Sequence, residues 1–337
     1  MSAAVPASVG KEHVQHIRDD RASVLREVRK IIIGQDDVVD DVMTSFFAGG
    51  HCLITGVPGL AKTLLISTLG RALELTFKRI QFTPDLMPSD IVGHEVLIER
   101  DGRREMTFVH GPIFSNIVLA DEINRTPPKT QAALLEAMQE HQVTVGGTTT
   151  PLPEPFFVLA TQNPIEHEGT YPLPIAQQDR FMFSLFISYP KMDEEKEILD
   201  TTTSNRFVDI RPALHGEQLL HAQQVIRNIP VATPIARYAV TLATSSRPNS
   251  ELAPAFVREY VSIGASLRGS QYLVLGARAR AALDGRLAVS VEDIRSVALG
   301  VLRHRIVTNF KAAAAKVDSD EIVKRLIEAV PAPRAEL

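Results

Sequence analysis

The residues most suited to chemistry form one short segment of this 337-residue chain. The pattern G-x-x-x-x-G-K-[ST] is met by Gly56-Val57-Pro58-Gly59-Leu60-Ala61-Lys62-Thr63, except that Ala61 replaces the second glycine. An apolar run at 53–55 precedes this segment, and a helical pattern at 61–72 overlaps its end. A loop between a strand and a helix directs backbone N–H groups and the helix N-terminus at one anion. The segment, together with Leu64, is therefore predicted to bind nucleotide phosphates.

Two acids follow a second apolar run, at 117–120. Ligands of open α/β sheets bind at the carboxyl ends of the strands, where Asp121 and Glu122 would lie. We expect Asp121 and Thr63 to hold Mg²⁺, and Glu122 to polarise an attacking water. An isolated pair of acids is more often a helix cap or a turn. Following a phosphate-binding loop, the pair instead indicates hydrolysis.

A third apolar run, at 156–160, ends in Thr161-Gln162-Asn163-Pro164. The amide of Asn163 could donate to a γ-phosphate and accept from a water without adding negative charge. An asparagine before proline can also simply form a turn, and the local sequence leaves this alternative open. Together the three strand ends predict a nucleoside triphosphatase.

The elements that must position these residues change character near residue 190. From 54 to 187, short apolar runs alternate with helical patterns, which predicts an α/β layer with a parallel sheet covered on both faces. Helical patterns dominate afterwards, at 193–199, 232–243, 257–267, 272–283 and 291–302. Ser290 and Asp293 form a capping box before the last of these. We expect a flexible leader over 1–20, a nucleotide-binding core over 21–190, and a helical linker and lid over 191–337.

Composition restricts the classes of protein. Lys and Arg total 36 against 40 Asp and Glu, a net charge of −4, so the total does not suggest a strongly basic nucleic-acid surface. Cys52 is the single cysteine, and no histidine makes metal-ligand spacing with it, so neither a disulfide nor a zinc site is expected. No run approaches the roughly 18 apolar residues of a membrane span, and the N-terminus lacks the apolar core of a secretory signal. These features predict a cytoplasmic protein.

With these residues in hand, the chain resembles MoxR-type AAA+ ATPases from about residue 31 to the C-terminal region. Besides the phosphate-binding loop, the resemblance is carried by Leu86-Met87-Pro88-Ser89-Asp90, Asp121-Glu122-Ile123-Asn124-Arg125, Ala160-Thr161-Gln162-Asn163-Pro164, Gln178-Asp179-Arg180-Phe181 and Gly264-Ala265-Ser266-Leu267-Arg268. Ala61 is normal in that family, whereas Leu267 stands where the family usually places proline. The resemblance implies a P-loop αβα AAA+ core, an all-helical lid, and a ring, commonly hexameric, that binds ATP and Mg²⁺ between subunits.

The same resemblance assigns two arginines and an adenine-flanking segment. It makes Arg180 the arginine finger that reaches a neighbour's γ-phosphate, and Arg268 the sensor arginine of the lid. An arginine supplied in trans would stabilise the charge that develops on the phosphoryl group. The alternative for Arg180 is a surface ion pair with Asp179 or another acid. Whether Arg268 acts in its own subunit or a neighbour's is left open. Gly34 and Gln35 resemble the backbone that flanks the adenine.

Two predicted hairpins bear on what the motor acts upon. One spans 96–108 around Arg100-Asp101-Gly102-Arg103, and the other spans 142–150 with Gly146-Gly147 at its turn. In the helix-insert branch of AAA+ proteins, which the chain resembles, such hairpins point toward the pore. A nucleic-acid motor would need basic tips, but the second tip is neutral while the first carries Arg100, Arg103 and Arg104. A protein client is therefore favoured over nucleic acid.

The leading hypothesis is a Mg²⁺-dependent ATPase, converting ATP and water to ADP and phosphate, that acts as a ring-forming chaperone-like motor on a protein client. The resemblance adds a von Willebrand A domain partner. A helicase-like nucleic-acid motor is the first alternative, and a nucleotide-gated binding switch with little turnover is the second. Glu122 and Asn163 argue against the switch, because they supply a base and a water-orienting amide. Arg303-His304-Arg305 is interpreted as a helix-end charge group and not as a site.

Overall fold

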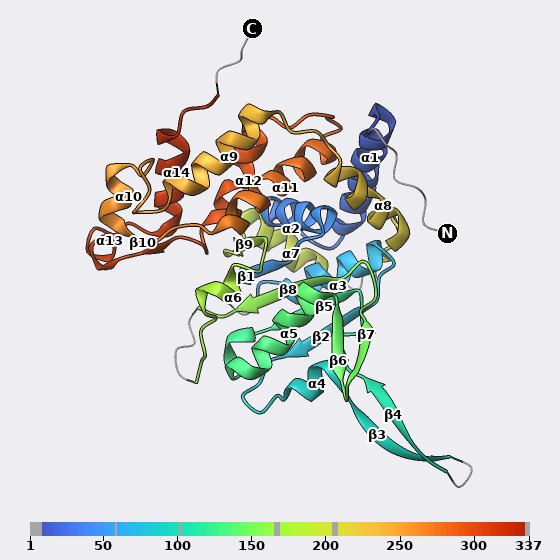
Figure 1. The fold of residues 1–337 in the computed structure, drawn as a ribbon. Helices are drawn as coiled ribbons and strands as arrows, with labels where there is room; N and C mark the ends of the chain where they lie inside the picture. The colour runs from blue at the N-terminus through green and yellow to red at the C-terminus, as the bar shows by residue number, and fades with distance from the viewer. Residues whose placement is uncertain (1–8, 58, 101–102, 165–168, 204–207, 334–337) are drawn as a thin grey trace.

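The centre of the molecule is a five-stranded parallel sheet with strand order β2-β5-β8-β1-β9. The computed structural model describes residues 9–57, 59–100, 103–164, 169–203 and 208–333 (Figure 1). The sheet strands are β1 (Cys52–Thr55), β2 (Phe77–Gln81), β5 (Ile117–Asp121), β8 (Phe157–Gln162) and β9 (Phe183–Phe186). The three apolar runs predicted as strands are therefore β1, β5 and β8, and they form the middle of the sheet, with β8 between the other two.

Alternate residues of the strands enter two separate apolar cores. Ile117 and Leu119 of β5 belong to a core shared with helices α1 (Lys11–Val28), α2 (Asp36–Ala48) and α3 (Lys62–Ala72). Val118 and Ala120 belong to the other core, which includes α5 (Pro128–Glu140). Because side chains alternate along a strand, a fully apolar run is what burial on both faces requires. Polar side chains are then placed where the strands end.

Both predicted hairpins are present. After the short helix α4 (Pro88–Val92), strands β3 (Gly93–Arg100) and β4 (Arg103–His110) form an antiparallel ribbon that projects from the body of the molecule (Figure 1). Asp101 and Gly102 lie outside the described residues. The second hairpin joins β6 (Gln142–Val145) and β7 (Thr148–Pro151) through Gly146 and Gly147, whose φ angles are 58° and 82°. Two positive φ angles are what a type I′ turn requires, and glycine supplies them without strain.

The C-terminal part is mainly helical. Its helices are α7 (Met192–Thr202), α8 (Gly216–Arg227), α9 (Thr233–Ser245), α10 (Ala255–Tyr260), α11 (Leu267–Leu283), α12 (Val291–Leu302), α13 (Phe310–Ala314) and α14 (Ser319–Ala329). The boundary expected at 190 falls between β9 and α7. Ser290 caps α12 by accepting from the N–H of Asp293, as the capping box predicted. No helix among the described residues is long and apolar enough to cross a membrane.

One lid segment differs from its predicted helix at 257–267. The structure has α10, then strand β10 (Val261–Ile263) paired with β11 (Val307–Thr308), and a new helix that begins at Leu267. At Gly264 the backbone passes so close to residue 246 that a Cβ on residue 264 would collide with the Ser246 carbonyl. Ser266 then caps α11, so Leu267 begins the helix without the proline that the family usually has there.

The N-terminal region also differs from expectation. Helix α1 begins at Lys11, so residues 11–20 are helical and not a flexible leader. Val14 and Ile17 are buried, and α1 packs against α3, α8 and α11. The segment contains an apolar stripe at helical spacing, which includes Val24 and Val28. Its many charged residues made this helical pattern hard to detect in the sequence.

Candidate nucleotide-binding site

A cavity of about 420 Å³ lies at the carboxyl edge of the sheet. Its lining residues come from the loop after β1, the ends of β5 and β8, and β2: Gly59, Leu60, Ala61, Lys62, Thr63, Leu64, Arg79, Asp121, Glu122 and Asn163. The structure thus brings together the three strand ends singled out from the sequence. Pro58 lies outside the described residues. A larger cavity of about 790 Å³, between α1 and α8, contains none of the predicted site residues.

The phosphate-binding loop has a backbone suited to an anion. A Cβ on Gly56 would lie 2.9 Å from the carbonyl oxygen of Ile187, so the residue after β1 has no room for a side chain. Gly59 and Ala61 have φ angles of 87° and 55°. Alternation of such left-handed residues with right-handed ones is how successive N–H groups are turned to one side of a loop. Val57, which belongs to the loop, is half-buried.

Lys62 begins α3, and its ammonium group donates to the Gly56 carbonyl at 2.6 Å. Burial lowers the pKa of Lys62, and the nearby carboxylates of Asp121 and Glu122 offset this only in part. The ammonium therefore lies at the mouth of the loop, between the backbone and the acids. A nucleotide phosphate in the cavity could replace the carbonyl as its partner.

Asp121 is held by two neighbouring strands. Arg79 of β2 donates to its carboxylate from Nε at 3.0 Å and from Nη2 at 2.6 Å. The Thr161 hydroxyl of β8 donates to the other carboxylate oxygen at 2.6 Å and accepts from the Glu122 N–H at 2.9 Å. Sequence reasoning assigned no role to Arg79 or Thr161. Strand β2 contains the charged and polar residues Lys78, Arg79 and Gln81, but nothing in the sequence shows that this strand lies beside β5.

Glu122 has a left-handed backbone, with φ of 57°, and its carboxylate accepts from Gln81 at 2.8 Å and from Arg125 at 3.0 Å. Gln81 lies opposite Asp121 in the register of β2 and β5. Asn163 follows β8, is 6% exposed and lines the same cavity. The candidate base and the candidate water-orienting amide therefore share one chamber with Lys62.

The donors present fit a magnesium nucleotide. Among the described residues, no group of three or more His, Cys, Asp or Glu side chains is arranged to hold a metal. Two residues that carry oxygen donors, Thr63 and Asp121, do line the cavity. Mg²⁺ typically takes one or two protein oxygens and completes its shell with water and substrate phosphates. Thr63 and Asp121 meet that requirement, and the loop would supply the phosphate contacts.

Gly34 and Gln35 do not line this cavity. They are consecutive left-handed residues, with φ of 68° and 56°, immediately before α2. A Cβ on Gly34 would lie 2.6 Å from the Glu194 carboxyl carbon of α7, but this carboxyl is the end of a flexible side chain and could shift. The structure therefore explains the residue type at Gly34 by its φ angle of 68°, which glycine adopts without strain.

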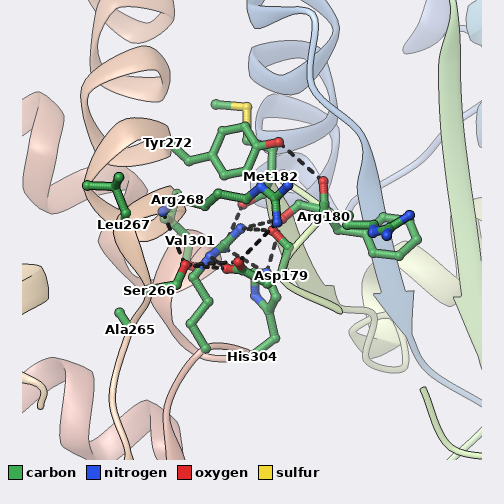
Figure 2. Close-up of polar contacts among 12 residues, drawn as sticks. Asp179, Arg180, Met182, Ala265, Ser266, Leu267, Arg268, Tyr272, Val301 and His304 are labelled. Carbon is green, nitrogen blue, oxygen red and sulfur yellow. Dashed lines mark hydrogen bonds and ion pairs between the residues drawn. The ribbon is translucent and has the colours of Figure 1, made fainter. Parts of the chain in front are cut away.

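Arg180 and Arg268 lie together at the junction of core and lid, and neither lines the cavity (Figure 2). Arg180 follows α6 (Ile175–Gln178) and donates to the Leu135 carbonyl of α5 at 2.8 Å. Arg268, the second residue of α11, lies 3.5 Å from the Asp179 carboxylate. Burial lowers the pKa of Arg180, and the positive charge of Arg268 lowers it further. Arg268 therefore contacts the carboxylate of Asp179, the residue that precedes Arg180 in the chain.

Residues 303–305 do more than place charge at a helix end. Arg305 donates to the Val301 carbonyl in the last turn of α12, but it also binds a distant carboxylate. Its side chain is 1% exposed and its Nε donates to Asp179 at 2.8 Å. His304 is buried with Nε2 3.1 Å from the Phe181 carbonyl, while Arg303 pairs with Asp320 at 2.8 Å. Asp179, the acid offered as a partner for Arg180, instead binds Arg305 and Arg268. Residues 126 positions apart make the Asp179–Arg305 pair, which no local pattern could show.

Comparisons with known proteins identify the family of the chain. Residues 51–183 match the ATPase family associated with various cellular activities (AAA), and residues 254–326 match an AAA lid domain. The chain is 42% identical to Chaperone MoxR1 of Mycobacterium tuberculosis over 308 residues, 91% of this chain and 81% of that protein. It is 32% identical to Protein MoxR of Methylorubrum extorquens, covering 94% and 96% of the two chains. A solved structure of a candidate ATPase from Cytophaga hutchinsonii has a TM-score of 0.89 and 39% identity, covering 96% of this chain and 98% of that one. The chain therefore belongs to the MoxR family of AAA+ ATPases.

Proposed function

We propose that this protein is a Mg²⁺-dependent ATPase that works as a ring-forming, chaperone-like motor on a protein client. The observation that carries the proposal is the single cavity in which Lys62, Asp121, Glu122 and Asn163 meet from three strand ends. The name of the Mycobacterium tuberculosis relative as a chaperone supports the same class of activity. A von Willebrand A domain partner and a hexameric ring belong to this proposal through the family resemblance.

Each side chain has a defined task in this proposal. The loop N–H groups and Lys62 bind the β- and γ-phosphates, and Thr63 and Asp121 hold Mg²⁺, which when bound neutralises charge on the phosphate oxygens. Glu122 accepts a proton from the attacking water, and Asn163 orients that water. Arg79 balances the charge of Asp121, because its guanidinium donates twice to that carboxylate.

Two arginines complete the site from a neighbouring subunit. Arg268 contacts the carboxylate of Asp179, the residue before Arg180, and neither arginine lines the cavity of its own chain. If Arg180 and Arg268 reach the γ-phosphate of ATP in a neighbouring subunit, both can stabilise the charge that develops there. Hydrolysis then depends on ring assembly. In this arrangement Arg268 acts in trans, together with Arg180.

The projecting β3–β4 hairpin favours a polypeptide client. Leu97 and Met106 face each other across the ribbon, and their side chains are 59% and 56% exposed. Arg104 lies 3.8 Å from Glu99, so its charge is partly balanced. Exposed apolar side chains suit contact with another protein better than contact with a phosphate backbone. Hydrolysis stimulated by DNA and not by unfolded protein would favour the nucleic-acid motor instead.

Mixing two inactive variants tests the trans arrangement. Lys62→Ala subunits keep Arg180 but have lost the phosphate-binding lysine, and Arg180→Ala subunits keep the pocket but have lost the finger. Arginine fingers contribute about 10³- to 10⁵-fold to turnover. We expect mixed rings to recover ATP hydrolysis that neither variant shows alone, whereas Arg237→Ala, which removes an exposed arginine of α9, should be active without mixing. Mixed rings that native mass spectrometry confirms, but that stay inactive, would contradict the trans role.

A further inference from the structure

The backbone that carries Arg180 is held by side chains of the lid (Figure 2). Arg305 donates to the carbonyls of Asp179 at 2.8 Å, Phe181 at 2.7 Å and Met182 at 3.3 Å. The Tyr272 hydroxyl of α11 donates to the remaining carbonyl, that of Arg180, at 3.2 Å. All four carbonyls of 179–182 are therefore bound by the lid, although the segment belongs to the core in sequence.

The Asp179 carboxylate joins three parts of the same junction. It accepts from the Ser266 hydroxyl at 2.8 Å and from Arg305 at 2.8 Å, and it lies 3.5 Å from Arg268. Ser266 is also the N-cap of α11, because its hydroxyl oxygen accepts from the Arg268 N–H at 3.1 Å. A single carboxylate thus determines where α11 begins, and with it the position of Arg268.

The Asp179–Arg305 pair is rigid because it is buried. Arg305 is 1% exposed, and its guanidinium lies 5.1 Å from the centre of the Tyr272 ring. Burial lowers the pKa of Arg305 to about 10, so the group is still charged at neutral pH. A buried charge has to keep its partners, since separation from them is strongly unfavourable. Separating the core from the lid at this point would therefore be costly.

We propose that Asp179, bound by Arg305, is a positioning residue that holds both Arg180 and Arg268 in place for a neighbouring subunit's nucleotide. This inference rests on the trans role of Arg180 proposed above. Asp179 touches no substrate in this scheme and acts through the two arginines. Since both arginines depend on one carboxylate, any displacement of the lid moves them together.

Placing Asp179→Asn in one or the other partner of a mixed ring tests this role. The reference is the active ring of Lys62→Ala subunits, which donate the arginines, and Arg180→Ala subunits, which supply the pocket. We expect Asp179→Asn in the donor to lower hydrolysis by about 10- to 100-fold, the loss that misplacement by about 1 Å causes. The same substitution in the pocket subunit should leave the rate within about twofold, because that subunit's own arginines are not used.

Asp293→Asn is the matched control. Asp293 is another buried carboxylate paired with an arginine, Arg286, at 2.5 Å, but it lies within the lid and is not part of the junction. Its loss should affect donor and pocket subunits equally. Tyr272→Phe removes only the hydroxyl that binds the Arg180 carbonyl, and it serves if Asp179→Asn fails to fold. A smaller loss confined to the donor is then expected, and an equal loss in both positions would contradict the proposal.

The outcomes separate this inference from the function on which it rests. If the reference ring is inactive although mixed rings have formed, the trans role fails and the positioning role fails with it. If the reference ring is active but Asp179→Asn lowers the rate equally in both positions, or in neither, only the positioning role is overturned. Asp179 would then be a structural ion pair.

Discussion

The phosphate-binding edge and the core–lid junction both contain many charged side chains, but these side chains differ in burial and in the number of their hydrogen-bond partners. At the edge, Lys62 is bound by a single backbone carbonyl, and the Arg79 side chain bound to Asp121 is 49% exposed. At the junction, the Arg305 side chain is 1% exposed and is bound by a carboxylate and several carbonyls. Charges at the edge can exchange their partners for a ligand, whereas those at the junction are already satisfied within the chain.

This difference teaches which substitutions should affect stability and which should affect chemistry. Removing one partner of a buried, hydrogen-bonded ion pair leaves an uncompensated charge, while removing a partly exposed cation leaves its neighbours in reach of water. Junction variants should therefore weaken the fold, and edge variants should weaken nucleotide handling in a folded protein. The following substitutions test that division, from the largest expected effect to the smallest.

Arg305→Ala should produce the largest change. It leaves the Asp179 carboxylate without its buried partner, for which we expect a loss of about 3–5 kcal/mol in the free energy of unfolding. Urea denaturation followed by circular dichroism measures this loss. Arg237→Ala, an exposed arginine of the same lid, is the control and should stay within about 0.5 kcal/mol of the parent protein. If the two variants are equally stable, the charges of the junction do not stabilise the fold more than exposed charges do.

Lys62→Ala should affect binding and leave the fold intact. Without the ammonium that neutralises the β- and γ-phosphates, we expect ATP affinity to fall by at least roughly 100-fold, about 2.7 kcal/mol. Isothermal titration calorimetry measures the affinity, and urea denaturation should find stability within about 0.5 kcal/mol of the parent. Unchanged affinity would contradict the assignment of the loop, and a large loss of stability would show that the edge is not independent of the fold.

Glu122→Gln should produce the smallest change in free energy, and it should affect turnover without affecting ATP binding. The amide keeps the shape of the carboxylate but is a poor proton acceptor, so ATP should bind while turnover falls at least about tenfold, or roughly 1.4 kcal/mol of barrier. Calorimetry and a phosphate-release assay measure the two quantities separately. Wild-type turnover would mean that another group activates the water.

Much of the edge could be predicted because its signals are local. The motif of residues 56–63 carries its own chemistry, and each remaining side chain follows an apolar run long enough for one buried strand. The same holds for α12, whose bounds agree with the predicted 291–302 because Ser290 and Asp293 cap it locally. By contrast, β10 lay inside a predicted helix, since strand pairing with Val307 and Thr308 depends on a distant segment.

The sequence by itself determined the family, the phosphate-binding loop and the acids at the strand ends, because each depends on residues that are neighbours along the chain. Only the tertiary structure decided that Arg79 binds Asp121, that Asp179 binds Arg305, and that Arg268 contacts Asp179, next to Arg180 and outside the pocket. These pairs depend on strand order and on how the lid packs against the core. Burial makes such pairs specific, because a charge removed from water must meet a partner, but it leaves no periodic pattern in the sequence.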